Sequence, residues 1–252
     1  NLEQFAFIAS HDLQEPLRKI KTFTNMLYEN YLDSMPGEAK NLLEKVHAAS
    51  DRMSSLIQDV LNFSRINTTE NAFVKTDINT ILTNVMEDFA LTSAETQANI
   101  KAGPLPAIEV IPVQINQLFY NLFSNSLKFC QKNKKPAITI STRSLSAVEV
   151  MKHQDLDKRF EYFEILFADE GIGFDPKYEE KIFQIFQRLH GKGEYAGTGI
   201  GLALCKKIVL NHSGVIFGES QEGLGALFHI ILPVNRHHAI GVVLPGQSCG
   251  GE

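Results

Sequence analysis

The 252-residue chain has little of several features that would define its class, beginning with cysteine and basic charge. Its three cysteines, Cys130, Cys205 and Cys249, lie in no C-x-x-C or histidine-rich pattern. This spacing argues against a disulfide framework or a zinc site and favours a reducing compartment. The 24 basic and 29 acidic residues give a formal net charge of −5 and no broad basic surface. We therefore expect no nucleic acid as a partner.

Long apolar runs are also absent. No run approaches the roughly 18 residues that span a bilayer, and no signal peptide opens the chain, so a soluble, cytoplasmic segment is expected. With 44% hydrophobic and 21% charged residues, the chain should form an ordered core, and its length allows two domains. It begins in helical rhythm without a start methionine, which indicates a fragment, so any upstream segment, such as a membrane anchor or a sensor, would lie outside it.

Two long helices are predicted at the front of the chain. The first runs from Leu2 to about Tyr31, and the second from about Glu38 to Asn67. The stretch LDSMPGEAK between them supplies turn residues. The first helix carries one apolar stripe, formed by Leu2, Phe5, Ala9, Leu13, Leu17, Ile20 and Leu27. Such a hairpin has too small a core alone, so we expect two copies to pair into a four-helix bundle, as a homodimer.

A histidine stands on the polar face of the first helix, in the stretch FIASHDLQEPLRKI. At about 100° per residue, His11 points about 170° away from the mean direction of the apolar stripe. It is therefore expected on the exposed face with Glu15 and Arg18, either simply solvated or presented to a partner. Pro16 lacks a backbone donor and should kink the helix just after the histidine.

Beyond about residue 70 the pattern becomes mixed. Helices are expected at Ile78–Leu91, Val113–Gln131 and Leu202–Asn211, and extended segments at Asn99–Ala102, Ile108–Val110, AITIST, YFEILFAD, GVIFGES and ALFHIILP. This order predicts an α+β sandwich with helices on one face of a sheet, and hence a hairpin domain, 1–69, and a second domain, 70–233. Residues 234–252 have no clear period and are interpreted as a loose or vector-derived tail with an incidental His-His pair.

Polar residues on one predicted helix form the first of three clusters in the second domain. The stretch QLFYNLFSNSLKF places Gln117, Asn121, Asn125 and Lys128 on adjoining turns. Asparagine is a poor residue for a helix interior, so the pattern needs a reason. An amide oxygen suits Mg²⁺, and a lysine can neutralise phosphate. A purely structural role is the equal alternative.

The second cluster, FADEGIGFD, ends an apolar strand at Asp169 and continues with Gly171 and Gly173. A buried carboxylate there can accept a hydrogen bond from an exocyclic amine, and the glycines let the backbone pass close to a flat base. A simple strand-end turn is the alternative.

The third cluster, GTGIGLALCKKIV, runs through Gly197, Gly199 and Gly201 straight into a helix. Free amide groups at that helix start, with the helix dipole behind them, suit a polyphosphate. Glycines at this spacing also serve tight packing, so the pattern alone does not decide.

The ordered set of clusters resembles the ATP-binding domain shared by sensor histidine kinases, type II topoisomerases, Hsp90 and MutL. The segment SHDLQEPL on the preceding hairpin narrows the resemblance to histidine kinases, and IFQIFQRLHGKGEYAGTGIGL looks like their phenylalanine pair and nucleotide lid, in the form often seen in phytochrome-like and PAS-linked kinases. The resemblance covers nearly everything from Phe5 to Pro233. It implies MgATP-dependent autophosphorylation on a histidine, followed by transfer to an aspartate of a response regulator.

The resemblance also implies residue roles. His11 becomes the phosphoacceptor and Asp12 its base or orienting acid. Asn125 should hold Mg²⁺ with support from Asn121. The other nucleotide-binding residues are Lys128 at phosphate, Asp169 at the adenine amino group, Gly171 and Gly173 around the base, Gly197, Thr198, Gly199, Gly201 and Leu202 in the phosphate loop, and Arg188, His190 and Lys192 as lid candidates for the γ-phosphate.

Departures from the family pattern and two rival functions bear on this interpretation. Glu15 stands four residues after His11, where many members carry Thr or Asn, which argues against phosphatase activity. Ser126 replaces the usual alanine after Asn125, a small change. The rivals are a scaffold that docks a regulator without using ATP, and a Ser/Thr kinase of the mitochondrial pyruvate dehydrogenase kinase type.

The linker near Ile66–Phe73 is expected to act as a hinge.

Overall fold

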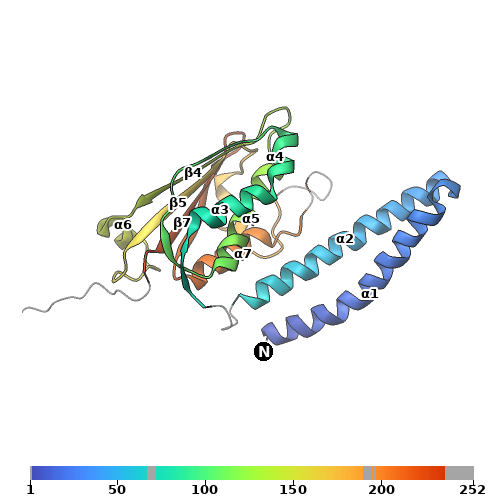
Figure 1. Cartoon of the computed structure of the whole chain (residues 1–252), viewed down its shortest axis with the longest axis horizontal. Coiled ribbons are helices and arrows are strands. Elements are labelled where there is room, and N and C mark those ends of the chain that lie inside the picture. The colour runs from blue at the N-terminus through green and yellow to red at the C-terminus, as the bar shows by residue number, and fades with distance from the viewer. Residues whose placement is uncertain (1, 67–71, 190–194, 196, 236–252) are drawn as a thin grey trace, which may run out of the picture.

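The computed structural model describes residues 2–66, 72–189, 195 and 197–235, and for residues 2–11 it describes the backbone alone. Within this part of the chain a two-helix hairpin precedes a domain that contains a five-stranded sheet (Figure 1). No helix among the described residues is long and apolar enough to cross a membrane. From residue 236 onward, the predicted tail lies outside the described residues.

The hairpin consists of α1 (Leu2–Tyr31) and α2 (Gly37–Arg65), joined by a short 3-10 turn at Leu32–Ser34. Helix α1 continues through Pro16 as one element and is curved in Figure 1, so the proline does not interrupt it. Helix α2 ends at Arg65. Its predicted end, Asn67, lies outside the described residues.

Few side chains hold the two helices of the hairpin together. Leu17 of α1 packs with Ile57 and Leu61 of α2 in a small buried cluster. Further along, Lys21 Nζ lies 2.7 Å from Asp51 Oδ1, a partly exposed ion pair that contributes little to stability. The order of these pairs along the two helices is that of an antiparallel hairpin, as predicted.

The second domain is built on a five-stranded sheet with the strand order β2-β4-β5-β7-β6. The β2–β4 pair is parallel, and the other three pairs are antiparallel. In that spatial order the strands are Asn99–Ala102, Ala137–Ser144, Tyr162–Asp169, Gly225–Pro233 and Val215–Gln221. A separate two-stranded sheet pairs β1 (Val74–Asp77) with β3 (Ala107–Val110).

The main core lies between this sheet and a layer of helices. The layer contains α3 (Ile78–Asp88), α5 (Pro112–Lys128) and α7 (Gly201–Asn211) (Figure 1). Successive strand residues point to opposite faces, so Phe163 and Phe167 of β5 enter this core, whereas Glu164 points to the other face. Helices packed on an antiparallel-rich sheet confirm the predicted α+β class.

Some short elements differ from the prediction. The helix predicted over Ile78–Leu91 is divided at Phe89 into α3 and α4 (Ala90–Thr96). Strand β1 was not predicted. Two 3-10 turns, Pro176–Tyr178 and Lys181–Phe183, follow β5.

Helix α6 (Ala147–Lys152) shows that the helices are not confined to one face of the sheet. It begins at a capping box, in which Ser146 and Glu149 satisfy each other's backbone donors. Its Val150 packs with Tyr162 of β5 in a second, smaller core. Tyr162 alternates with the residues that enter the main core, so α6 covers one end of the opposite face.

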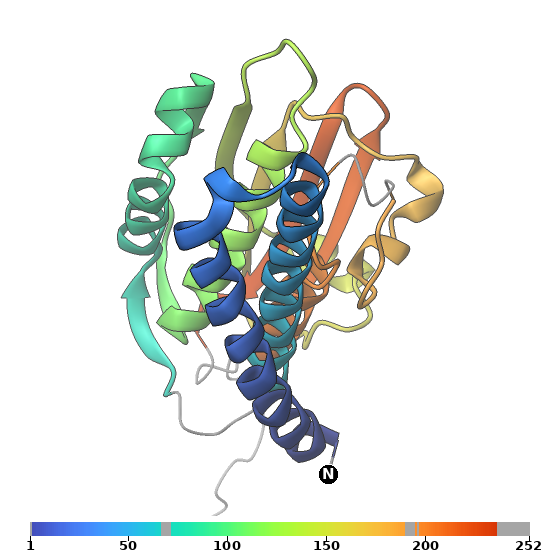
Figure 2. The same cartoon turned by 90° about the vertical axis from the view of Figure 1, so that its right-hand side faces the viewer.

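The hairpin and the second domain meet at the end of α2. Figure 2 shows the hairpin lying in front of the helical layer. Lys207 Nζ of α7 donates a 2.6 Å hydrogen bond to the Phe63 carbonyl, and Gln114 Nε2 of α5 donates a 3.0 Å bond to that of Ile66. The last carbonyls of a helix have no partner within it, so the second domain supplies partners for the end of α2.

Candidate nucleotide-binding site

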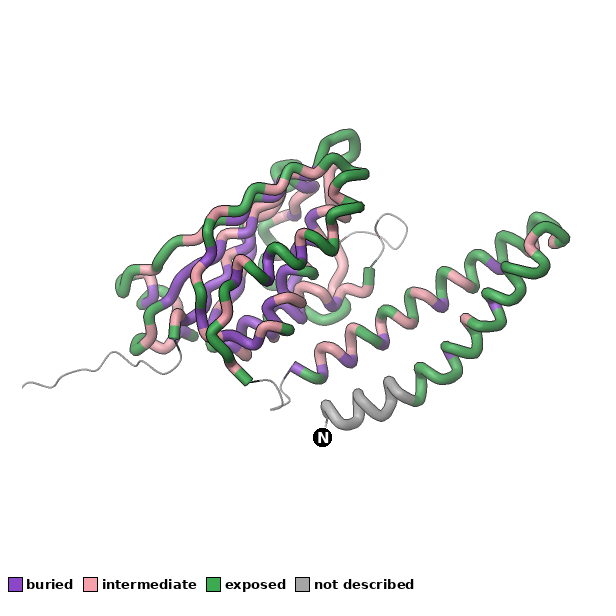
Figure 3. Tube along the Cα trace, viewed as in Figure 1, coloured by how far each residue is buried: buried purple, intermediate pink, exposed green. Residues whose placement is uncertain are grey.

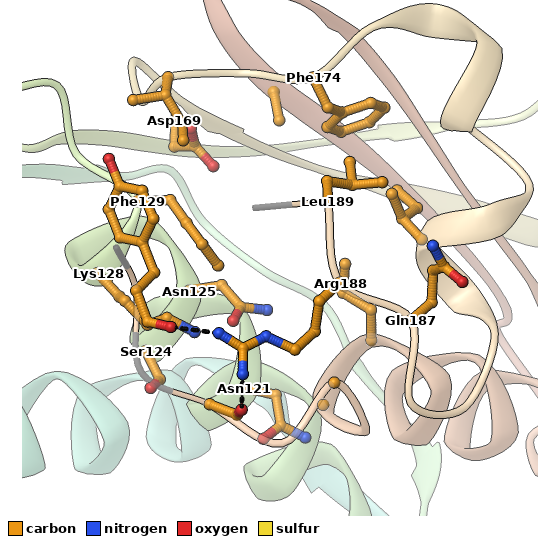
Figure 4. Close-up of a pocket in the computed structure, with 18 of the residues that line it drawn as sticks. Asn121, Ser124, Asn125, Lys128, Phe129, Asp169, Phe174, Gln187, Arg188 and Leu189 are labelled. Carbon is orange, nitrogen blue, oxygen red and sulfur yellow. Dashed lines mark hydrogen bonds between the residues drawn. The ribbon is translucent and has the colours of Figure 1, made fainter. Parts of the chain in front are cut away.

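A pocket of about 270 Å³ opens between α5, α7 and the segments that follow β5. Figure 4 places Asp169 on one side of it and Asn121 and Arg188 on the other. The pocket brings together residues from all three sequence clusters. The predicted site residues that line it are Asn121, Asn125, Lys128, Asp169, Gly173, Arg188, Gly197, Thr198, Gly199, Gly201 and Leu202.

Helix α5 contributes the amide and amine groups of the pocket. Its apolar face, which includes Leu118 and Leu122, is fully buried in the main core. The opposite edge turns Asn121, Asn125 and Lys128 into the pocket (Figure 4). The two asparagines that are unfavourable for a helix interior therefore face a cavity, not solvent.

The asparagines offer oxygen ligands but no complete metal site. Asn121 Oδ1 accepts a 3.2 Å hydrogen bond from Gln117 Nε2, while its buried Nδ2 has no partner. No group of three or more His, Cys, Asp or Glu side chains that could hold a metal ion occurs in the described part of the chain. This donor set fits Mg²⁺ that takes most of its ligands from phosphates and water, with the Asn125 amide oxygen as the protein ligand.

A half-buried carboxylate closes the opposite side of the pocket. Asp169 is the last residue of β5; its Oδ1 accepts from the Gly171 N–H at 2.9 Å, and its Oδ2 accepts from Ser126 Oγ at 3.1 Å. Burial raises the pKa of Asp169, and these hydrogen bonds, with one from the backbone of Ala226, oppose that rise. The carboxylate is thus fixed in orientation and can accept a further hydrogen bond from a ligand.

Close backbone contacts leave no room for a side chain at Gly171 and Gly173, the two glycines that follow Asp169. A Cβ at Gly171 would lie 2.7 Å from the Phe129 carbonyl oxygen, and one at Gly173 would lie 2.2 Å from that of Gln221. Gly173 also has a φ of +63°, in the region that favours glycine. Gly171 does not line the pocket but positions Asp169, so the turn is constrained by both packing and the carboxylate.

Two cations share the other side of the pocket. Burial, and then the charge of Arg188, lower the pKa of Lys128 to about 8. Arg188 Nη1 donates to the Gly197 carbonyl at 3.1 Å, and Nη2 donates to that of Tyr195 at 2.6 Å (Figure 4). An anion in the pocket would offset the repulsion between the two cations, so this side suits phosphate.

The glycine-rich loop leads directly into α7. Gly199 has a φ of +77°, and α7 begins at Gly201 with no side-chain cap at its start. Its first N–H groups therefore have no side-chain acceptor at the cap position and lie beside the pocket.

A contact between the loop and the hairpin was not predicted from the sequence. Thr198 Oγ1 donates a 2.6 Å hydrogen bond to Asp59 Oδ2 of α2. Burial raises the pKa of Asp59, and this hydrogen bond opposes the rise. The two residues are 139 positions apart, and Asp59 has no motif around it, so only the folded chain reveals the pair.

The remaining predicted residues are placed as follows. Asp12 lies exposed on α1. His11 belongs to α1, but its side chain is outside the described residues, as are the lid residues His190 and Lys192. Ser126, to which the sequence assigned no role, lies directly behind Asp169.

Comparisons with known proteins cover both parts of the chain. Residues 1–69 match the "His Kinase A (phospho-acceptor) domain", and residues 111–236 match the "Histidine kinase-, DNA gyrase B-, and HSP90-like ATPase". The structure of full-length ShkA in complex with AMPPNP aligns with a TM-score of 0.66 at 21% identity, over 91% of this chain and 45% of that one. At that identity, the alignment supports the fold.

Two curated relatives are similar over nearly the whole chain. Cyanobacterial phytochrome A of a Nostoc species is 39% identical over 235 residues, which are 92% of this chain and 28% of that protein. Phytochrome-like protein Cph1 of a Synechocystis species is 34% identical over 236 residues, 94% of this chain and 30% of that protein. The chain thus spans about three tenths of the length of these relatives. Together, the two domain matches and these relatives show that the chain belongs to the histidine kinase family.

Proposed function

We propose that the chain binds MgATP in the described pocket, transfers the γ-phosphoryl group to His11, and then passes it to an aspartate of a response regulator receiver domain. The observation that carries the proposal is the convergence of Asn125, Lys128 and Asp169 with the glycine-rich loop on one pocket. The chain that builds this pocket also carries a phospho-acceptor domain with His11 on its first helix.

The two sides of the pocket suit the two ends of ATP. The Asp169 carboxylate accepts a hydrogen bond from the adenine amino group, and Lys128 neutralises phosphate on the opposite side. The Asn125 amide oxygen ligates Mg²⁺, which supplies charge neutralisation on the phosphates. The N–H groups at the start of α7 bind phosphate oxygens. Arg188 donates to the carbonyls of Tyr195 and Gly197, at the C-terminal end of the lid segment, which places its charge near the terminal phosphates.

The residues of this chain then have defined parts in the transfer. A ring nitrogen of His11 forms a bond to the γ-phosphorus, while the bond from that phosphorus to the bridging oxygen breaks and ADP leaves with the electron pair. Asp12, next in the helix, holds the imidazole and takes up its ring proton. Positioning and charge neutralisation supply most of the rate enhancement, as is usual for phosphoryl transfer.

A second copy of the chain completes the hairpin. Large apolar side chains on α1 and α2 are exposed in the single chain, and they include Leu13, Ile20, Phe23, Met26, Leu27, Leu42, Val46 and Met53. An apolar surface of this extent is characteristic of an interface, and it supports a homodimer with a four-helix bundle. Within this assignment residues 1–69 form the phospho-acceptor domain and 70–233 the catalytic domain, with a sensor domain upstream.

Transfer requires His11 and ATP, which different domains hold, to approach each other. The contacts of Lys207 and Gln114 with the end of α2 tie that end to the catalytic domain. We place the hinge near Ile66–Phe73, of which residues 67–71 lie outside the described residues. Signal control then acts by changing how the hairpin helices pack.

Labelled MgATP tests the proposal. The wild-type chain should gain phosphate that is acid-labile and base-stable, and His11→Gln should gain none while it still binds ATP. An acid-stable label, or a label unchanged in His11→Gln, would contradict the mechanism and favour a Ser/Thr kinase. Absence of label despite ATP binding would favour a scaffold that docks a regulator. Transfer from the labelled chain to a receiver domain tests the second step.

A further inference from the structure

The hydroxyl behind Asp169 is a feature that the proposed function does not use. Ser126 follows Asn125 on α5, is 3% exposed, and does not line the pocket. Its Oγ nevertheless donates to Asp169 Oδ2 at 3.1 Å, while the Gly171 N–H donates to Oδ1 at 2.9 Å. The two carboxylate oxygens are therefore held by separate donors, one from a helix and one from the turn after β5. An alanine at position 126 would leave Oδ2 without its side-chain donor.

We propose that Ser126 is a positioning residue that orients the Asp169 carboxylate as a hydrogen-bond acceptor toward the nucleobase, and so sets the preference for a base with an amino group over one with a carbonyl at the same position. The inference rests on the proposed binding of ATP and assigns its base selectivity to a residue that never touches the ligand.

The chemistry follows from the single proton of the hydroxyl. An ionised carboxylate only accepts hydrogen bonds, whereas a protonated one can also donate. Burial favours the protonated form of Asp169, and the Ser126 hydroxyl, which donates, opposes it. An amino group needs an acceptor, and a carbonyl needs a donor. Loss of the hydroxyl therefore weakens recognition of adenine and relaxes the exclusion of hypoxanthine, which carries a carbonyl where adenine carries its amino group.

The test compares ATP with inosine triphosphate (ITP) in equilibrium titrations of the full chain. Ser126→Ala should weaken ATP binding by about three- to tenfold, the value of one hydrogen bond, and leave ITP binding unchanged or stronger. Because the pKa of Asp169 rises further in this variant, its loss of ATP affinity on acidification should occur at higher pH than in wild type. Ser126→Thr, which keeps the hydroxyl, should restore both properties. Ser144→Ala, an exposed serine at the far end of β4 from Asp169, is the matched control.

A double-mutant cycle separates positioning from a general change in the fold. In an Asp169→Asn background, the side chain no longer titrates and has its own donor, so adding Ser126→Ala should not change the ATP-to-ITP ratio. The inference is overturned if Ser126→Ala shows the ratio and pH profile of wild type, or if it changes the ratio equally in the Asp169→Asn background. A wild-type chain that binds no ATP would overturn the proposed function itself, whereas ATP binding with an unchanged Ser126→Ala would overturn this inference alone.

Discussion

The hairpin and the second domain, called the α/β domain below, bury their apolar residues to different extents. Figure 3 shows that the buried residues are concentrated in the sheet and its helices. Phe119, Phe123 and Phe167 of the α/β domain are completely buried. In the hairpin, by contrast, Phe23 is 62% exposed and Leu42 is equally exposed, although both lie on long helices. Apolar residues therefore complete a core in one region and leave a surface along the helices of the other, which fits the proposed pairing of two hairpins.

The largest effect is expected from charges on the exposed apolar face of the hairpin. Phe23→Asp combined with Leu42→Asp should convert the dimer to monomers. Each lost side chain removes about 1.5–3 kcal/mol of burial and occurs twice in a symmetric dimer, so the dissociation constant should rise more than about a thousandfold. Sedimentation measures the association, and ATP titration should show no change.

Leu91→Asp is the matched control for that experiment, since Leu91 is 74% exposed on α4 of the α/β domain. It should leave association unchanged. Equal loss of association in both variants would show that the two regions do not differ in the way that their burial indicates.

An intermediate effect is expected from Lys128, within the α/β domain. Its pKa is lowered to about 8, so above that pH the lysine must take up a proton when phosphate binds, because phosphate favours the charged lysine. ATP affinity should therefore fall by at most about tenfold per pH unit above pH ~8. Without ligand, the unfolded chain binds the proton more tightly, so the free energy of unfolding should rise as the pH increases from about 8 toward the ordinary lysine pKa.

Titrations with Lys128→Gln and Lys128→Arg check this pH dependence. Lys128→Gln should bind ATP more weakly at neutral pH and lose the decline above pH ~8. Lys128→Arg should keep a charge throughout, because the arginine pKa lies far higher. A decline that persists in both variants would assign the titration to another group.

The smallest effect is expected at the contact between the two regions. Thr198 has one hydroxyl proton, which it donates to Asp59. Asp59→Ala frees that proton for a phosphate, so ATP affinity should rise by about two- to threefold, less than a full hydrogen bond because Thr198 is partly exposed. Calorimetric titration measures the change, and Gln58→Ala, its exposed neighbour on α2, should have none. A weaker affinity in Asp59→Ala would mean that the contact supports nucleotide binding.

The parts of the fold that were predicted from sequence are those with long periodic patterns. Helices α1 and α5 and strand β5 each carry an apolar repeat over many residues, and their predicted positions agree with the structure. The elements missed or misjudged are short. Strand β1 is mostly exposed and lacks alternation, α6 depends on the Ser146 cap, and the break at Phe89 has no glycine or proline to mark it.

The candidate site shows the same limit. The asparagines of α5, Asp169 and the glycine-rich loop could be identified because each lies within a short motif, and the pocket brings these motifs together. The side chains that hydrogen-bond to these residues could not be identified in this way. Ser126 and Asp169 are 43 positions apart, and their interaction depends on how α5 packs beside the end of β5. Proximity of this kind follows from packing, which a single sequence does not display.

The hydrogen bonds at the end of α2 have a mechanical consequence. Two side chains from different helices, Gln114 and Lys207, hold the carbonyls of Ile66 and Phe63. These carbonyls are three residues apart, about 4.5 Å along a helix axis. Both carbonyls lie away from the helix axis, so hydrogen bonds at these two points oppose rotation of α2 about that axis. While both hydrogen bonds persist, twist of α2 about its own axis therefore reaches the ATP-binding domain as torque, and the proposed hinge near Ile66–Phe73 moves only after they break.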